Sequence, residues 1–147
     1  MHSPILAPVV ALVAWSLLMM AWMYAVRLPA LKRKGISLKG RVGSKGGDLD
    51  GVVEPEVQWK AHNYNHLMEQ PTLFYAIALS LAVMNVGGGF NLILGWAYVG
   101  CRVAHSLVQA TVNAVQPRFL LFIAGSLCLA ALTLHAIMAL LGVHLHG

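Results

Sequence analysis

Long apolar runs alternate with short polar breaks along this chain of 147 residues. The first run lacks the basic start and cleavage site of a signal peptide, so we expect a retained transmembrane helix that ends before Pro29. The hydrophobic pattern predicts helices at about residues 5–28, 57–86, 91–113 and 118–143, with a polar loop at about 29–56. The expected fold is therefore all-α: a single domain built as an integral membrane four-helix bundle with one long and two short connections.

The composition agrees with a membrane protein, because 59% of the residues are hydrophobic and only 10% are charged. The net charge is +5, but eight of the ten basic residues lie between Arg27 and Lys60, in or beside the first connection. This distribution is typical of a membrane surface, and we expect no nucleic acid partner. The same asymmetry predicts that the first and third connections are cytoplasmic and that both termini face the opposite side.

A polar stretch in the middle of the chain, Tyr64 to Pro71, precedes an apolar run that is too short to cross a bilayer alone. From Pro71 to Val86 this run covers about 16 residues, or roughly 24 Å of helix, whereas a span needs about 20 residues. The second helix must therefore begin earlier, with Pro71 bending it near the membrane boundary. Glu69 then lies at the edge of the hydrocarbon, where a charged side chain is costly and usually functional.

Four polar residues of the second helix, His62, Asn65, His66 and Glu69, have helical spacings that place them on one broad face. One interpretation is a structural cluster that hydrogen-bonds neighbouring helices. The alternative is a metal site, since two histidines four residues apart and a carboxylate can supply three ligands. Only His105 is available as a further ligand, so we expect no metal.

Arg102 stands near the middle of the third helix and is followed by His105 on the same face. A charge at this depth needs a partner, and Glu69 is the only acidic residue near a span, which predicts a Glu69–Arg102 ion pair. The pair is either structural or part of a ligand pocket between helices. Arg118 starts the fourth helix, where the helix dipole favours an anion. It either sets the topology or stabilises a thiolate.

Together these motifs resemble the MAPEG family, the membrane-associated proteins in eicosanoid and glutathione metabolism. The resemblance rests on Asn65 to Pro71, on Leu73 to Tyr75, and on Arg102-x-x-His105 placed sixteen residues before Arg118. A basic first loop and four apolar helices complete it. It extends over almost the whole chain.

The resemblance implies a homotrimer that binds glutathione as co-substrate between subunits, near the cytosolic face. It also implies a thiol-dependent transferase or peroxidase that acts on a lipophilic substrate drawn from the membrane lipids. We expect a location in a bacterial inner membrane. The alternative is a non-catalytic module of the same fold that binds a lipid or a partner; a channel is not favoured, because the polar positions do not run through the bundle.

The resemblance also implies residue roles. Arg118 matches the arginine that activates the thiol, Arg27 one that meets a glutathione carboxylate, and Glu69 the glutamate suited to the glutathione amine. The remaining positions that would shape the glutathione site are His62, Asn65, His66, Arg102 and His105. His62 and His66 stand where the family pattern has an arginine and an asparagine, so a different thiol or the binding module stays open.

Overall fold

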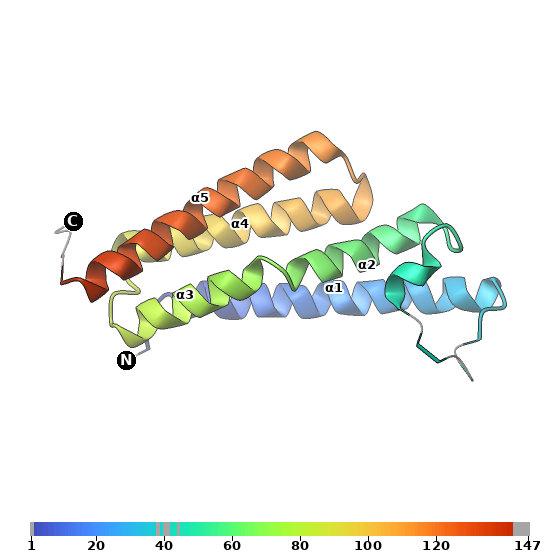
Figure 1. The fold of residues 1–147 in the computed structure, drawn as a ribbon, viewed down its shortest axis with the longest axis horizontal. Coiled ribbons are helices and arrows are strands. Elements are labelled where there is room, and N and C mark those ends of the chain that lie inside the picture. The colour runs from blue at the N-terminus through green and yellow to red at the C-terminus, as the bar shows by residue number, and fades with distance from the viewer. Residues whose placement is uncertain (1, 38, 40–41, 44, 143–147) are drawn as a thin grey trace.

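Helices account for nearly all of the chain in the computed structural model, which describes residues 2–37, 39, 42–43 and 45–142. In chain order they are α1 (Leu6–Arg33), the short 3₁₀ helix η1 (Gly46–Leu49), α2 (Pro55–Leu67), α3 (Pro71–Val83), α4 (Gly89–Thr111) and α5 (Val115–Leu140). Helices α2 and α3 follow one another along α1, so the five α-helices form four rods (Figure 1). The all-α, four-helix prediction is confirmed, with no strand among the residues described. By length and composition, α1 and α5 are able to cross a membrane.

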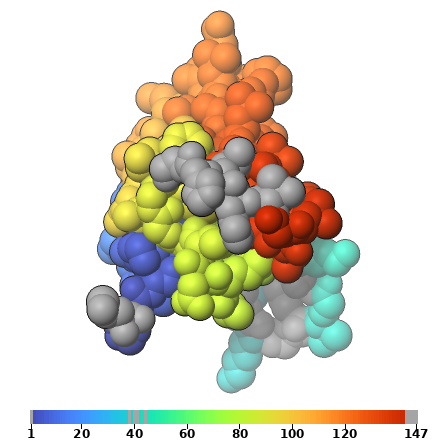
Figure 2. Space-filling model, turned by 90° about the vertical axis from the view of Figure 1, so that its left-hand side faces the viewer, coloured from blue at the N-terminus to red at the C-terminus, as the bar shows by residue number. Residues whose placement is uncertain are grey.

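The two ends of the bundle differ. The start of α1, the α3–α4 turn and the end of α5 lie at one end, and the long first connection and the α4–α5 turn lie at the other (Figure 1). Seen end-on in Figure 2, the yellow-green end of α3 lies between the blue start of α1 and the red end of α5. The basic first connection therefore shares an end of the molecule with Arg118, near the start of α5.

Helix α1 does not end before Pro29, as the sequence predicted, but continues to Arg33 with Pro29 inside it. An interior proline costs about 3 kcal/mol, because it removes one hydrogen bond and its ring crowds the preceding turn. Packing of the extension offsets this cost, since Ala30 and Leu31 are buried against Leu49 and neighbouring residues of the first connection. The extra turn of α1 is thus stabilised by tertiary contacts that the local sequence does not reveal.

The second rod is broken where the sequence predicted a bend. Helix α2 ends at Leu67 and α3 begins at Pro71, which lacks the N–H that would bond the Leu67 carbonyl. Tighter bonds join residues three apart across the break: the Met68 N–H donates to the Asn65 carbonyl at 2.9 Å, and Thr72 to Glu69 at 3.2 Å. Glu69 therefore lies in the break, beyond the end of α2 and before the start of α3.

Short turns connect the remaining rods, and their positions differ from the expected ones by a few residues. Helix α4 ends at Thr111 and Asn113 takes a left-handed backbone conformation, with φ of 51°, which asparagine tolerates better than most residues. Helix α5 begins at Val115 and includes Pro117 in its first turn. Proline is tolerated there because the N–H groups of the first turn have no acceptor within the helix, so the missing N–H costs no hydrogen bond. The predicted end at residue 143 lies outside the described residues.

The apolar core joins the rods in the half of the bundle away from the first connection. Phe74 of α3 stacks on Tyr98 of α4 with ring centroids 4.4 Å apart, and neither side chain is exposed. Residues of α1 and α5 complete this core around Leu12 and Leu132. The polar residues considered below lie between this core and the first connection.

Candidate functional site

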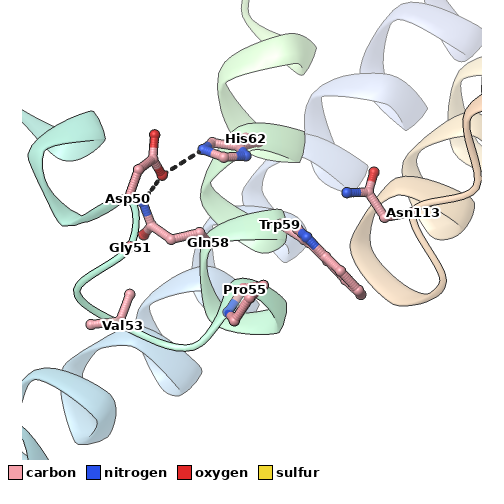
Figure 3. A pocket seen from close by; sticks show the side chains of 8 residues that line it. All are labelled: Asp50, Gly51, Val53, Pro55, Gln58, Trp59, His62 and Asn113. Carbon is pink, nitrogen blue, oxygen red and sulfur yellow. Dashed lines mark hydrogen bonds and ion pairs between the residues drawn. The ribbon is translucent and has the colours of Figure 1, made fainter.

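A cleft of about 340 Å³ opens between the first connection, helix α2 and the α4–α5 turn (Figure 3). Asp50 and the neighbouring residues of the connection form one side, and Asn113 of the α4–α5 turn contributes from the other. Gln58, Trp59 and His62 of α2 lie between them. This volume is within the range of small-molecule sites, about 300–1,000 Å³. The cleft is a candidate small-molecule site, and His62 is a predicted site residue that lines it.

Asp50 is the acidic group of the cleft. Its Oδ1 accepts a hydrogen bond from Gln58 Nε2 at 2.6 Å and lies 3.1 Å from His62 Nε2. The Gln58 hydrogen bond, helped by the nearby His62 and Arg27, holds the pKa of Asp50 below its ordinary value of 3.8, although partial desolvation opposes this. The carboxylate is therefore negatively charged at neutral pH.

Arg27, predicted to meet a ligand carboxylate, holds the first connection in place. Its Nη2 donates to the Gly46 carbonyl at 2.7 Å, and Gln58 Nε2 points to the same oxygen at 3.4 Å. Arg27 of α1 thus holds η1, which leads into Asp50, against α1. Its role toward a ligand stays a prediction.

Arg118 is half-buried near the N-terminus of α5 and is held by the turn that precedes it. Its Nη1 donates to Asn113 Oδ1, and its buried Nε has no hydrogen-bond partner among the described residues. Asn113 also lines the cleft. The guanidinium and the positive end of the α5 dipole therefore lie beside the cleft, where they favour an anion.

A second polar cluster lies at the helix break. Arg102 is only 1% exposed, and it donates to the His66 carbonyl at 2.9 Å and to Gln70 Oε1 at 3.4 Å. The Glu69 carboxylate is instead 3.0 Å from His66 Nδ1, and the Glu69 side chain is 68% exposed. The predicted Glu69–Arg102 ion pair is therefore wrong. The break turns Glu69 away from Arg102 and leaves a backbone carbonyl that accepts from Arg102 Nη2 instead, while the buried Arg102 Nε has no hydrogen-bond partner among the described residues.

The remaining predicted site residues are His66, His105 and Asn65. The His105 ring meets the His66 ring edge-on, with centroids 4.8 Å apart, so both belong to the cluster at the break. Asn65 is exposed, whereas its neighbour Asn63 is 1% exposed and donates to Ser106 Oγ at 2.8 Å. His62, Asn65 and His66 keep their common face on α2, whereas Glu69 lies beyond the end of this helix and contacts His66.

Sequence reasoning missed several residues of the two sites. Asn63 had a readable signal, since it precedes Leu67 by four residues and Pro71 by eight, and all three are buried on one side. No sequence signal pointed to Asp50, Gln58 and Trp59. They come together because a glycine-rich loop without periodicity brings Asp50 to α2. No group of three histidine, cysteine or acidic residues lies close enough to hold a metal in the described part of the chain.

The helical rods, the two helices long and apolar enough to cross a membrane, and the polar cleft at one end are typical of a helical membrane protein. The chain belongs to the MAPEG family, whose model matches residues 5–138. No curated protein and no solved structure matches the chain. The family match covers every helix of the bundle up to the last turn of α5.

Proposed function

We propose that this MAPEG family protein is a membrane transferase or peroxidase that uses a thiol, with glutathione as the first candidate co-substrate. The observation that carries the proposal is Arg118, which is held by Asn113 beside the cleft. A positive charge at a helix N-terminus lowers the pKa of a nearby thiol and stabilises the thiolate, the nucleophilic form. Arg118 is the catalytic residue in this proposal.

Two reactions are compatible with such a thiolate. In a transfer reaction the thiol loses its proton and its sulfur forms a bond to an electrophilic carbon of the lipophilic substrate. A double bond or a carbon–oxygen bond at that carbon breaks, and the atom that receives its electron pair takes up a proton. In a peroxidase reaction two thiols are oxidised to a disulfide, while a lipid hydroperoxide is reduced to the alcohol and water. Both need the thiol at the polar end of the bundle and the second substrate in the bilayer.

The proposal includes a bilayer setting and an assembly. Exposed apolar side chains along α1 and α5, among them Leu17, Leu18, Leu120 and Leu127, suit contact with lipid or with other subunits. We place the first connection and the α4–α5 turn on the cytoplasmic side of a bacterial inner membrane, and we expect a homotrimer. Crosslinking in native membranes and labelling of introduced cysteines test the assembly and the topology.

The decisive experiment measures thiolate absorbance when glutathione is added to the purified protein at pH 7. A free thiol is only a few per cent ionised at this pH, so a strong signal reports stabilisation by the protein. Arg118→Ala should abolish the signal and Arg118→Lys should retain part of it. Arg33→Ala, which removes an exposed charge in the last turn of α1, is the matched control and should leave it unchanged. Absence of binding at millimolar glutathione would refute the proposal.

A second candidate function is a non-catalytic module that binds a lipid or a partner. One observation favours it: Glu69 is engaged by His66, and Arg102 by the backbone and Gln70, so these charges already have partners within the subunit. In this case native lipid extracts should raise the melting temperature of the protein and glutathione should not. The opposite result supports the enzyme.

A further inference from the structure

We propose that the end of α1 and the first connection form a binding surface for an acidic phospholipid of the adjoining leaflet. The inference concerns basic side chains outside the cleft, since no lysine or arginine is among the described residues that line the cleft. It goes beyond the proposed thiol reaction and is independent of it.

The acidic and basic residues at this end of the bundle differ in their pairing. The acidic side chains of the connection are engaged within the molecule: Asp48 by a backbone N–H, Asp50 by Gln58 and Glu54 by Lys34. Exposed basic residues without an ion pair in the described part of the chain include Lys32, Arg33 and Lys39. Their positive charge is therefore available to an anion outside the chain.

The connection is anchored beside the last turns of α1. Arg27, which donates to the Gly46 carbonyl, lies about 9 Å before Arg33 along the helix, so the connection returns alongside α1 (Figure 1). Leu49 is buried against Leu31 and its neighbours and holds the returning chain there. The connection and the end of α1 therefore form one surface at a defined height on the bundle.

Lys60 and Trp22 mark the membrane boundary at this height. Lys60 Nζ lies 5.4 Å from the centre of the Trp22 ring, which is a cation–π contact between two residue types that favour the headgroup level of a bilayer. The headgroup layer adds about 5–8 Å to each side of the hydrocarbon, and Lys32 follows Trp22 by about 15 Å of helix. The unpaired charges thus lie within about one Debye length, roughly 8 Å, of the lipid phosphates.

Exposed side chains on one face of α1 change from apolar to basic toward this end. Leu17, Tyr24 and Leu28 are each more than half exposed, and the exposed Lys32 follows Leu28 at a helical spacing of four. A phospholipid has the same order of acyl chains, glycerol and charged headgroup. This order favours a lipid over a soluble anion, which gains nothing from the apolar part of the surface.

The test measures how strongly phosphatidylglycerol and phosphatidylcholine associate with the purified protein in mixed vesicles, from quenching of tryptophan fluorescence by brominated forms of each lipid. A basic residue near an acidic membrane surface favours association about fivefold, so wild-type protein should prefer phosphatidylglycerol by about this factor. Lys32→Gln combined with Arg33→Gln should reduce the preference to less than about twofold, because two of the unpaired charges are removed. Salt at 1 M, where the Debye length is about 3 Å, should have a similar effect.

Two variants serve as matched controls. Lys32→Arg combined with Arg33→Lys keeps both charges and should retain the preference of the wild-type protein. Lys34→Gln removes the neighbouring lysine, which already pairs with Glu54, and should reduce the preference less than the double glutamine variant does.

Equal association of the two lipids with wild-type protein would overturn the proposal, because the basic residues would then act only on the topology. A preference that is unchanged in the double glutamine variant would also overturn it, since the acidic lipid would then bind elsewhere. The wild-type comparison decides the point even if that variant does not fold. Thiolate absorbance tests the proposed function separately, so the two proposals can fail independently.

Discussion

The stability of the helix break provides the sharpest test of the structure, because two arrangements of Glu69 and Arg102 predict very different energies. If Glu69 balanced the buried arginine, Glu69→Gln would leave an uncompensated buried charge and cost about 3–5 kcal/mol. In the structure Glu69 is 68% exposed and pairs with His66, and such exposed pairs contribute about 0–1 kcal/mol. We therefore expect Glu69→Gln to destabilise the protein by less than about 1 kcal/mol.

Arg102 should behave in the opposite way. Replacing it with methionine removes the 2.9 Å hydrogen bond to the His66 carbonyl and the 3.4 Å bond to Gln70 Oε1, and leaves these acceptors only the longer bonds from the Glu69 N–H at 3.4 Å and the Tyr98 hydroxyl at 3.5 Å. We expect a loss of about 1–3 kcal/mol. The assay is equilibrium unfolding in mixed micelles, followed by circular dichroism, for the two single variants and the double variant. Glu56→Gln, at an acid in the first turn of α2, is the control for charge loss. A coupling energy between Glu69 and Arg102 above about 2 kcal/mol would refute the structural interpretation.

Two further predictions concern packing between rods. Ser106→Ala should destabilise the protein by about 1–3 kcal/mol, because it removes the hydrogen bond that the buried Asn63 amide donates, and adding Asn63→Leu should recover part of this loss. Gly87→Ala should also be destabilising, since a β-carbon there would lie 2.6 Å from the Ile5 side chain at the start of α1. A β-carbon at Gly100 meets no atom within 4 Å, so Gly100→Ala should stabilise α4 by up to about 1 kcal/mol. The same unfolding assay measures both, and equal effects at the two glycines would contradict the packing described here.

Much of the architecture follows from the sequence alone. Apolar runs of membrane length, separated by polar breaks, indicate four helical rods, because a helix is the arrangement in which such a run satisfies its own backbone. Motif order and spacing identified the family, which the family match confirms. The basic first connection and the position of Arg118 near the start of the last helix were also readable, because both depend on local composition and helix termini.

Only the tertiary structure decided which polar groups meet. Periodicity assumes one continuous helix, and the break before Pro71 invalidates that assumption where Glu69 lies. The pairing of Asp50 with α2 depends on how a loop without periodicity folds back, and Arg27 contributes by binding the loop backbone. A sequence specifies its helices through short-range contacts, whereas a site formed by a loop, a helix break and a turn depends on contacts between distant segments. The cleft beside Arg118 belongs to this second kind, and its acidic residue became apparent only in the folded chain.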